Sequence, residues 1–279
     1  MNRDRLKFLW RSGLEYFINA KTIHDLDAPF VFNLTRSLYD KSKDSSRRID
    51  IEKRRSELKK DQTTLEREDP GQGSIHAKLN TKKVKVSSWI RSSAISPYYG
   101  RILSRLVKFL NPSCMIELGT AAGISGSYLS SGADQASLIT IEGDPAIARI
   151  AHLTFDHLAM ANIKLIPEVF ESALPAILTS HAPDLIFIDG NHQSIALSQY
   201  IDQVYSKLAP GVSTIIIDDI RWNEDMYSEW KKLSKDTRWQ ISIDLLRIGI
   251  LIKNPNILQH HNYKIIHFFL KPWRLGIMR

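Results

Sequence analysis

Short apolar runs alternate with longer amphipathic stretches from about residue 86 onward. The runs predict buried strands and the stretches predict helices, which is typical of an α/β fold with a parallel sheet. The predicted strands are 115–118, 137–142, 163–167, 185–189 and 213–218. The predicted helices are 124–131, 145–161, 171–180, 194–208 and 224–235.

Two further β-rich runs, 239–245 and 248–253, follow these elements with almost nothing between them. Their closeness predicts an antiparallel hairpin at the edge of the sheet. Five alternating strands closed by such a pair give a mostly parallel, Rossmann-like sheet of seven strands.

The N-terminal third has a different pattern. An apolar face at helical spacing predicts a helix over residues 6–18, formed by Leu6, Leu9, Trp10, Leu14, Phe17 and Ile18. We expect this face to dock on the body of the protein or on a partner subunit. The flanking Arg and Lys residues leave a membrane-surface helix open as an alternative. A second apolar patch, 29–34, precedes another helix.

Residues 41–69 carry interleaved positive and negative side chains, which predicts a solvated helix. The segment 69–74 is rich in Gly and Pro and predicts a loop. We therefore expect a helical, basic N-terminal appendage over residues 1–85, an α/β sheet domain over 86–254 and a C-terminal extension over 255–279.

Composition narrows the functional classes. With 279 residues and 43% hydrophobic residues, the chain is long enough to bury a full core. Residues 1–85 hold 20 Lys and Arg against 13 Asp and Glu, so most of the net charge of +8 belongs there. No aromatic residue lies between Lys43 and Lys85 to stack on a base, so nucleic-acid binding is not favoured. The single cysteine, Cys114, excludes an internal disulfide and fits a reducing compartment, and we expect a cytoplasmic protein.

A small-residue loop follows the first predicted strand and precedes a helix. The glycines at 119, 123 and 126 do not match the spacing of a dinucleotide-binding loop, and no Gly-Lys-Ser/Thr follows to make a P-loop. Small residues at this position let a ligand approach the backbone closely, and the helix N-terminus offers amide donors.

The run from Glu117 to Gly123, Glu-Leu-Gly-Thr-Ala-Ala-Gly, resembles motif I of class I S-adenosylmethionine (SAM)-dependent methyltransferases. The resemblance implies that this loop wraps the methionine end of the cofactor, and it assigns the cofactor contacts to Glu117, Gly119, Thr120, Ala121 and Gly123. Glu142, at the end of the second strand, is similar to the ribose-binding acid of the family.

The segment after the third strand corresponds to the region that touches adenine in that family. Phe170 could pack on the ring, and Glu171 or Ser172 could reach its amine. Phe170 as an ordinary core residue is an equally good interpretation.

Carboxylates also follow the fourth and fifth predicted strands. Asp189 ends one strand, and Asp218 and Asp219 end the other. Parallel strands bring such residues to one edge of the sheet, where three carboxylates would repel one another. A hard divalent cation such as Mg²⁺ would relieve that repulsion. Capping of the following helix by the Asp pair is the alternative.

These residues resemble the metal-dependent small-molecule O-methyltransferases of the catechol, caffeoyl-CoA and antibiotic-sugar types. The resemblance implies that Asp189, Asp218 and Asp219 hold Mg²⁺, that Asp189 also lines the cofactor site, and that Asp189 or His192 is the catalytic base. Arg221 and Trp222 are candidates for the border of the acceptor pocket.

The sequence therefore predicts SAM-dependent methyl transfer to an oxygen of a small-molecule acceptor, assisted by Mg²⁺. An aminopropyl transferase on the same fold, and a non-catalytic module that acts through its basic N-terminal helices, stay open as alternatives. A homodimer and a peripheral membrane contact also stay open, the latter because the C-terminal extension is apolar and basic.

Overall fold

The computed structural model describes residues 3–67, 82–190 and 193–271. Its internal contacts divide the chain into two compact units. The central unit is Asp40–Pro183, and the terminal unit combines Met1–Tyr39 with Asp184–Arg279. The three domains expected over 1–85, 86–254 and 255–279 stay a prediction.

The sheet of the central unit consists of three parallel strands, β3 (Cys114–Leu118), β4 (Ser137–Ile141) and β5 (Ile163–Ile166), with β4 in the middle. A helix follows each strand in turn: α6 (Ile124–Ser130), α7 (Pro145–His157) and α8 (Phe170–Ser180). Helix α7 begins where its sequence predicts, because Asp144 accepts hydrogen bonds from two amides of the first turn and Pro145 follows it.

The charged segment that opens the central unit is only partly helical. After η2 (Lys41–Lys43), helix α3 spans Arg48–Leu58. The helix predicted over 41–69 is wrong beyond Leu58, because β1 (Thr64–Arg67) pairs antiparallel with β2 (Lys82–Lys85). Exposed and half-buried side chains alternate along β1, which is the periodicity of a strand. Helices α4 (Val86–Ser93) and α5 (Pro97–Leu110) then lead to β3.

The terminal unit contains the remaining strands, in the order β10-β8-β9-β7-β6. Strands β6 (Leu185–Ile188) and β7 (Ser213–Ile217) are parallel, and α9 (Ser194–Tyr205) connects them. Helix α10 (Glu224–Leu233) precedes the antiparallel hairpin of β8 (Ile241–Asp244) and β9 (Gly249–Lys253). The hairpin is not at the edge, because β10 (His261–Lys264) adds a parallel strand beside β8. The predicted α/β fold class, with mainly parallel strands and one antiparallel hairpin, is confirmed.

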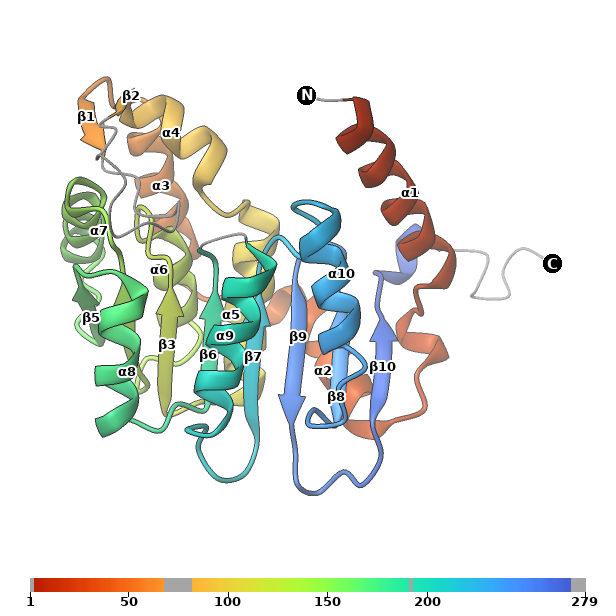
Figure 1. Cartoon of the computed structure of the whole chain (residues 1–279). Helices are drawn as coiled ribbons and strands as arrows, with labels where there is room; N and C mark the ends of the chain where they lie inside the picture. Colours follow the sequence, from red (N-terminus) through yellow and green to blue (C-terminus); the bar gives the residue numbers. More distant parts are fainter. Residues whose placement is uncertain (1–2, 68–81, 191–192, 272–279) are drawn as a thin grey trace. The chain divides into compact units, whose positions relative to one another are not determined.

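Helix α1 (Arg3–Asn19) belongs to the terminal unit (Figure 1). It buries Phe8, Ser12 and Tyr16, and the Tyr16 hydroxyl donates a hydrogen bond to the carbonyl of Ile265. The face predicted to dock does not pack on the described part of the chain: Trp10 is 73% exposed and Ile18 is 60% exposed. Its docking on a partner subunit stays a prediction. The row of Phe8, Ser12 and Tyr16, spaced four residues apart, faces inward instead.

The patch 29–34 is itself helical, since α2 spans Pro29–Tyr39 after the short η1 (Ile23–Asp25). At the other end of the described chain, η4 (Phe268–Leu270) follows β10. No helix among the described residues combines the length and the apolar composition needed to cross a membrane.

Candidate functional site

The loop between β3 and α6 has an unusual backbone. Gly119, Ala121 and Gly123 adopt φ angles of 101°, 47° and 80°, in the left-handed region that glycine enters without strain. At Gly123 a Cβ atom would lie 2.8 Å from Cε1 of Phe155, so no larger residue fits there without a shift. The sequence of small residues is therefore required by this turn.

Glu142 lies against this loop. Leu118 pairs with Ile141 across β3 and β4, so the residues that follow both strands are neighbours. Glu142 Oε2 accepts a hydrogen bond from the Ala121 amide at 3.0 Å, and its Oε1 accepts one from the Asp144 amide at 3.0 Å. Burial raises the pKa of Glu142 even though both amides favour the carboxylate.

Glu117 and Thr120 support the loop from the core side. Both are fully buried. Thr140 Oγ1 lies 2.6 Å from Thr120 Oγ1 and donates to Glu117 Oε2 at 2.6 Å. Burial raises the pKa of Glu117 to about 7. Its second oxygen, Oε1, is buried and has no hydrogen-bond partner among the described residues.

Phe170, Glu171 and Ser172 form the first turn of α8. The Glu142 amide donates to the carbonyl of Ile166, so the end of β5 lies at the same sheet edge as Glu142. Phe170 is half-buried, whereas Glu171 and Ser172 are exposed. Their assignment to the adenine ring stays a prediction.

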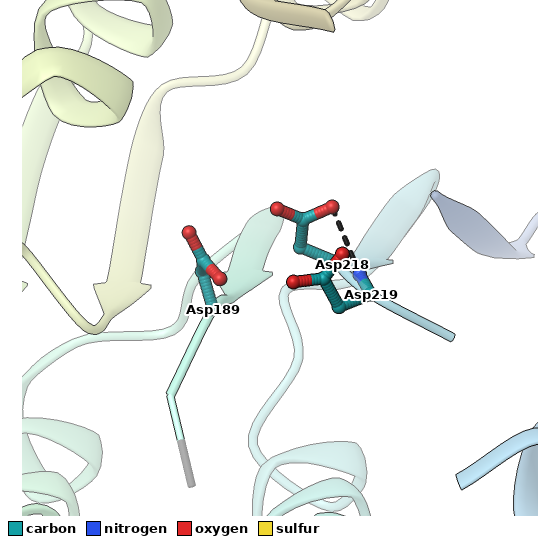
Figure 2. Close-up of side chains that lie close together, drawn as sticks. All are labelled: Asp189, Asp218 and Asp219. Atoms are coloured by element: carbon teal, nitrogen blue, oxygen red, sulfur yellow. Dashed lines mark hydrogen bonds between the residues drawn. The ribbon is translucent and has the colours of Figure 1, made fainter. Parts of the chain in front are cut away.

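The three predicted metal-binding aspartates lie together at the ends of β6 and β7 (Figure 2). One carboxylate oxygen from each of Asp189, Asp218 and Asp219 falls within 4.8 Å of the others. Ile188 pairs with Ile217, which places the residues after both strands side by side. Asp219 has a φ of 50°, and its amide donates to Asp218 Oδ1 at 2.9 Å.

A cation that the sequence interpretation missed neutralises part of this carboxylate cluster. Arg247 donates from Nε to Asp218 Oδ1 at 2.8 Å and from Nη2 to Asp218 Oδ2 at 2.6 Å. Its Nε also lies 3.2 Å from Asp219 Oδ1. Because β9 is antiparallel to β7 and Gly249 faces Ile217, the β8–β9 turn lies at the same edge as the aspartates.

Helix α1 contributes a second cation. The Arg5 guanidinium lies 4.6 Å from the centre of the Trp222 ring. Burial and the charge of Asp218 raise the pKa of Asp219 to about 6, and the positive charges of Arg247 and Arg5 oppose that increase. The two arginines thus reduce the mutual repulsion of the three acids.

Two other sequence candidates have different outcomes. His192 lies outside the described residues. Arg221 is buried, donates to both carboxylate oxygens of Asp244 at 2.8 and 2.7 Å, and contacts Tyr227. Its expected place at the border of an acceptor pocket is wrong, because the guanidinium stabilises the hairpin from within the core.

With this geometry established, comparison with known proteins is informative. Residues 116–220 match the methyltransferase domain family. The matched segment runs from β3, through the glycine loop and Glu142, to the residues that follow β7.

Curated relatives agree with this match. A protein from Mycobacterium sp. (strain JLS), assigned as an O-methyltransferase, is 30% identical over 130 residues, which are 46% of this chain and 58% of that protein. A second, from Mycolicibacterium smegmatis, is 33% identical over 105 residues, or 37% of this chain and 50% of that protein. The chain thus spans a little over half the length of the curated relatives it matches.

Solved structures share the fold. A cofactor-bound protein from MTB has a TM-score of 0.50 and 19% identity, with 58% of this chain and 83% of that chain covered. A methyltransferase from Podospora anserina bound to S-adenosylhomocysteine (SAH) has a TM-score of 0.50 and 19% identity, with 58% and 80% covered. These structures confirm the fold, and the family match together with the curated relatives confirms the predicted resemblance to methyltransferases.

Proposed function

We propose that this chain is a SAM-dependent methyltransferase that moves a methyl group to an oxygen of a small-molecule acceptor in the cytoplasm. The observation that carries the proposal is the carboxylate of Glu142 held against the left-handed loop 119–123, inside the segment that matches the methyltransferase domain family. The curated relatives, which are assigned as O-methyltransferases, support oxygen as the acceptor atom.

The residues of the central unit fit SAM. Glu142 offers two carboxylate oxygens, which suit the paired hydroxyls of a ribose. The loop exposes backbone between Gly119 and Gly123 that a ligand can approach closely. Glu117 Oε1 is a buried polar atom without a hydrogen-bond partner among the described residues, which favours a hydrogen-bonding group nearby. When bound, SAM supplies an electrophilic methyl group on its sulfonium.

The acidic cluster of the terminal unit fits a divalent cation. All three side chains offer oxygen, the donor atom that Mg²⁺ prefers. Three carboxylates with Arg247 and Arg5 sum to a formal charge of −1, so the cluster keeps a net negative charge that favours a cation. Asp218 Oδ1 already accepts hydrogen bonds from Arg247 and from the Asp219 amide, whereas Oδ2 keeps lone-pair capacity beyond its bond to Arg247. Bound at this cluster, Mg²⁺ would lower the pKa of an acceptor hydroxyl.

In this proposal the protein positions the reactants and accepts a proton. With SAM bound, its methyl group would pass from the sulfonium to the acceptor oxygen, and SAH would leave. The hydroxyl proton passes to Asp189, with His192 as the second candidate base. Arg247 holds Asp218 in a fixed orientation.

Calorimetric titration with SAH tests the cofactor part of the proposal. Glu142→Ala removes both ribose-binding oxygens, so we expect the Kd for SAH to rise about tenfold or more, as for a lost charge-assisted hydrogen bond. Asp134→Asn changes a carboxylate that is 66% exposed and is the matched control. Absence of SAH binding to the wild type would refute the cofactor site.

Mn²⁺ titration followed by electron paramagnetic resonance tests the metal part independently. We expect Asp218→Asn to weaken Mn²⁺ binding and to abolish methyl transfer to catechol-type acceptors, while SAH affinity stays at the wild-type level and shows that the variant is folded. Asp202→Asn, at a side chain that is 65% exposed, is the control. Equal Mn²⁺ affinity in the wild type and Asp218→Asn would remove the metal from the proposal and leave the SAM site standing.

A further inference from the structure

Helix α1 exposes an apolar row that nothing in the described chain covers. Leu6, Trp10, Leu14 and Ile18 are spaced four residues apart, so they follow one another along the helix surface. Their exposed fractions are 46%, 73%, 42% and 60%. Phe17, beside this row, is 37% exposed. We call these five residues the α1 apolar face.

The apolar face continues onto the segment after β10. Phe269 and Leu270 of η4 are 72% and 57% exposed. The next residue, Lys271, donates from Nζ to the carbonyls of Ile18 and Ala20, and this ammonium lies 5.2 Å from the Phe17 ring centre. Both segments therefore expose their apolar side chains near the C-terminal end of α1.

A basic row runs beside the apolar face. Arg3, Lys7 and Arg11 are also spaced four residues apart, and all three are exposed. Asp4 is the only acidic residue among the first 14 positions, where Arg5 is a fourth cation. Glu15 is bound to Lys264 at 2.6 Å and does not compete for these cations. An apolar stripe with a cationic border is the arrangement of helices that lie in a membrane interface.

We propose that the α1 apolar face, with Phe269 and Leu270, docks this protein on an anionic lipid surface. The apolar side chains would enter the boundary between headgroups and acyl chains, while Arg3 and Lys7 contact lipid phosphates. Charge complementarity selects this occupant over a second copy of the chain, because two copies meeting through α1 would bring their basic rows together. The opposite face of α1, which contains the buried residues Phe8, Ser12 and Tyr16, stays packed against the rest of the terminal unit.

Vesicle co-sedimentation of the full chain tests the proposal. We expect binding to vesicles of phosphatidylglycerol and phosphatidylcholine, little binding to phosphatidylcholine alone, and weaker binding as salt screens the charges. Trp10→Ser combined with Leu14→Ser removes two exposed anchors, so the bound fraction should fall about tenfold or more. Arg3→Glu combined with Lys7→Glu should remove the preference for anionic vesicles.

Exposed apolar residues elsewhere on the terminal unit give the matched control. Ile195 and Leu258 are 74% and 97% exposed, and Ile195→Ser combined with Leu258→Ser should leave vesicle binding unchanged. Circular dichroism melting checks that all variants fold. Failure of the wild type to bind anionic vesicles would refute the proposal. So would light scattering that shows a dimer which Trp10→Ser with Leu14→Ser dissociates, because the face would then belong to a second copy.

Discussion

Glu117 holds a carboxyl group in a fully buried position, with burial raising its pKa to about 7. The folded protein keeps this proton up to about pH 7, whereas the unfolded chain releases it near the ordinary glutamate pKa of about 4.3. The free energy of unfolding therefore falls as pH rises through this window and levels off above it. We expect Glu117→Gln to remove this contribution, on the order of 2 kcal/mol, because glutamine cannot ionise.

Urea unfolding of the wild type and Glu117→Gln checks this prediction. The measurements run from pH 5 to pH 8 in steps of about one pH unit. The charge of Glu142, whose pKa is also raised, adds to the increase in the pKa of Glu117, so the difference between the two proteins includes this coupling. Glu66→Gln changes an exposed carboxylate on β1 and should leave the pH dependence unaltered. Parallel curves for the wild type and Glu117→Gln would show that Glu117 ionises normally in the folded state.

For single residues, the sequence predicted the carboxylates of the acidic cluster more readily than the arginine that binds them. Asp218 and Asp219 stand out because two acids directly follow an apolar strand, and strand direction alone places them near Asp189. Arg247 is one of many arginines and lies 29 residues from Asp218. Only the pairing of β7 with β9, which no local pattern specifies, brings its guanidinium to the cluster.

At the scale of secondary-structure elements, strand β9 requires a glycine at position 249, and hydrophobic patterns do not explain why. A Cβ atom on Gly249 would lie 2.5 Å from Cζ3 of Trp230, whose ring is fully buried and cannot retreat. We expect Gly249→Ala to lower the free energy of unfolding by about 1–3 kcal/mol through overpacking. The same shift would disturb the turn that carries Arg247.

Gly13→Ala in α1 is the matched control for Gly249→Ala. No atom lies within 4 Å of the added methyl group there, so alanine should stabilise the helix by about 0.5–1 kcal/mol. Chemical denaturation of both variants measures the contrast. If both substitutions changed stability in the same direction, contact with Trp230 would not be the reason for glycine at 249.

Hydrophobic periodicity predicted that the helix exists, but it did not predict which face of the helix is buried. The apolar positions of residues 6–18 predict a helix, and α1 is one. The same positions were expected to be the buried face, but the face with Phe8 and Tyr16 is buried instead. Tyr16 packs with Ala20 and Ile266, and the ring centres of Phe8 and Tyr227 lie 6.0 Å apart. Helical spacing shows which residues share a face; it does not show which of two apolar faces finds a partner.

At the scale of the whole molecule, the two units differ in how the chain builds them. The central unit is one continuous segment, whereas the terminal unit joins residues from both ends of the sequence. Contacts between such distant segments close long loops, so forming them costs more conformational entropy than forming contacts within one segment. Tyr16 with Ile265 and Lys271 with Ile18 are contacts of this kind. No local sequence pattern predicts that pairing.

A substitution at Lys271 tests whether this residue anchors the two ends of the sequence to each other in the terminal unit. Its side chain is 2% exposed, and its ammonium satisfies the carbonyls of Ile18 and Ala20 at the end of α1. Lys271→Met keeps the length of the side chain but leaves those carbonyls without this donor, so we expect a loss of about 1–3 kcal/mol in the free energy of unfolding. Hydrogen–deuterium exchange should accelerate in the second half of α1 before it changes in the strands of the central unit. Lys235→Met, at an exposed lysine, should alter neither measurement. Unchanged exchange in α1 of Lys271→Met would mean that the other contacts between the two ends, such as Tyr16 with Ile265 and Glu15 with Lys264, hold α1 without Lys271.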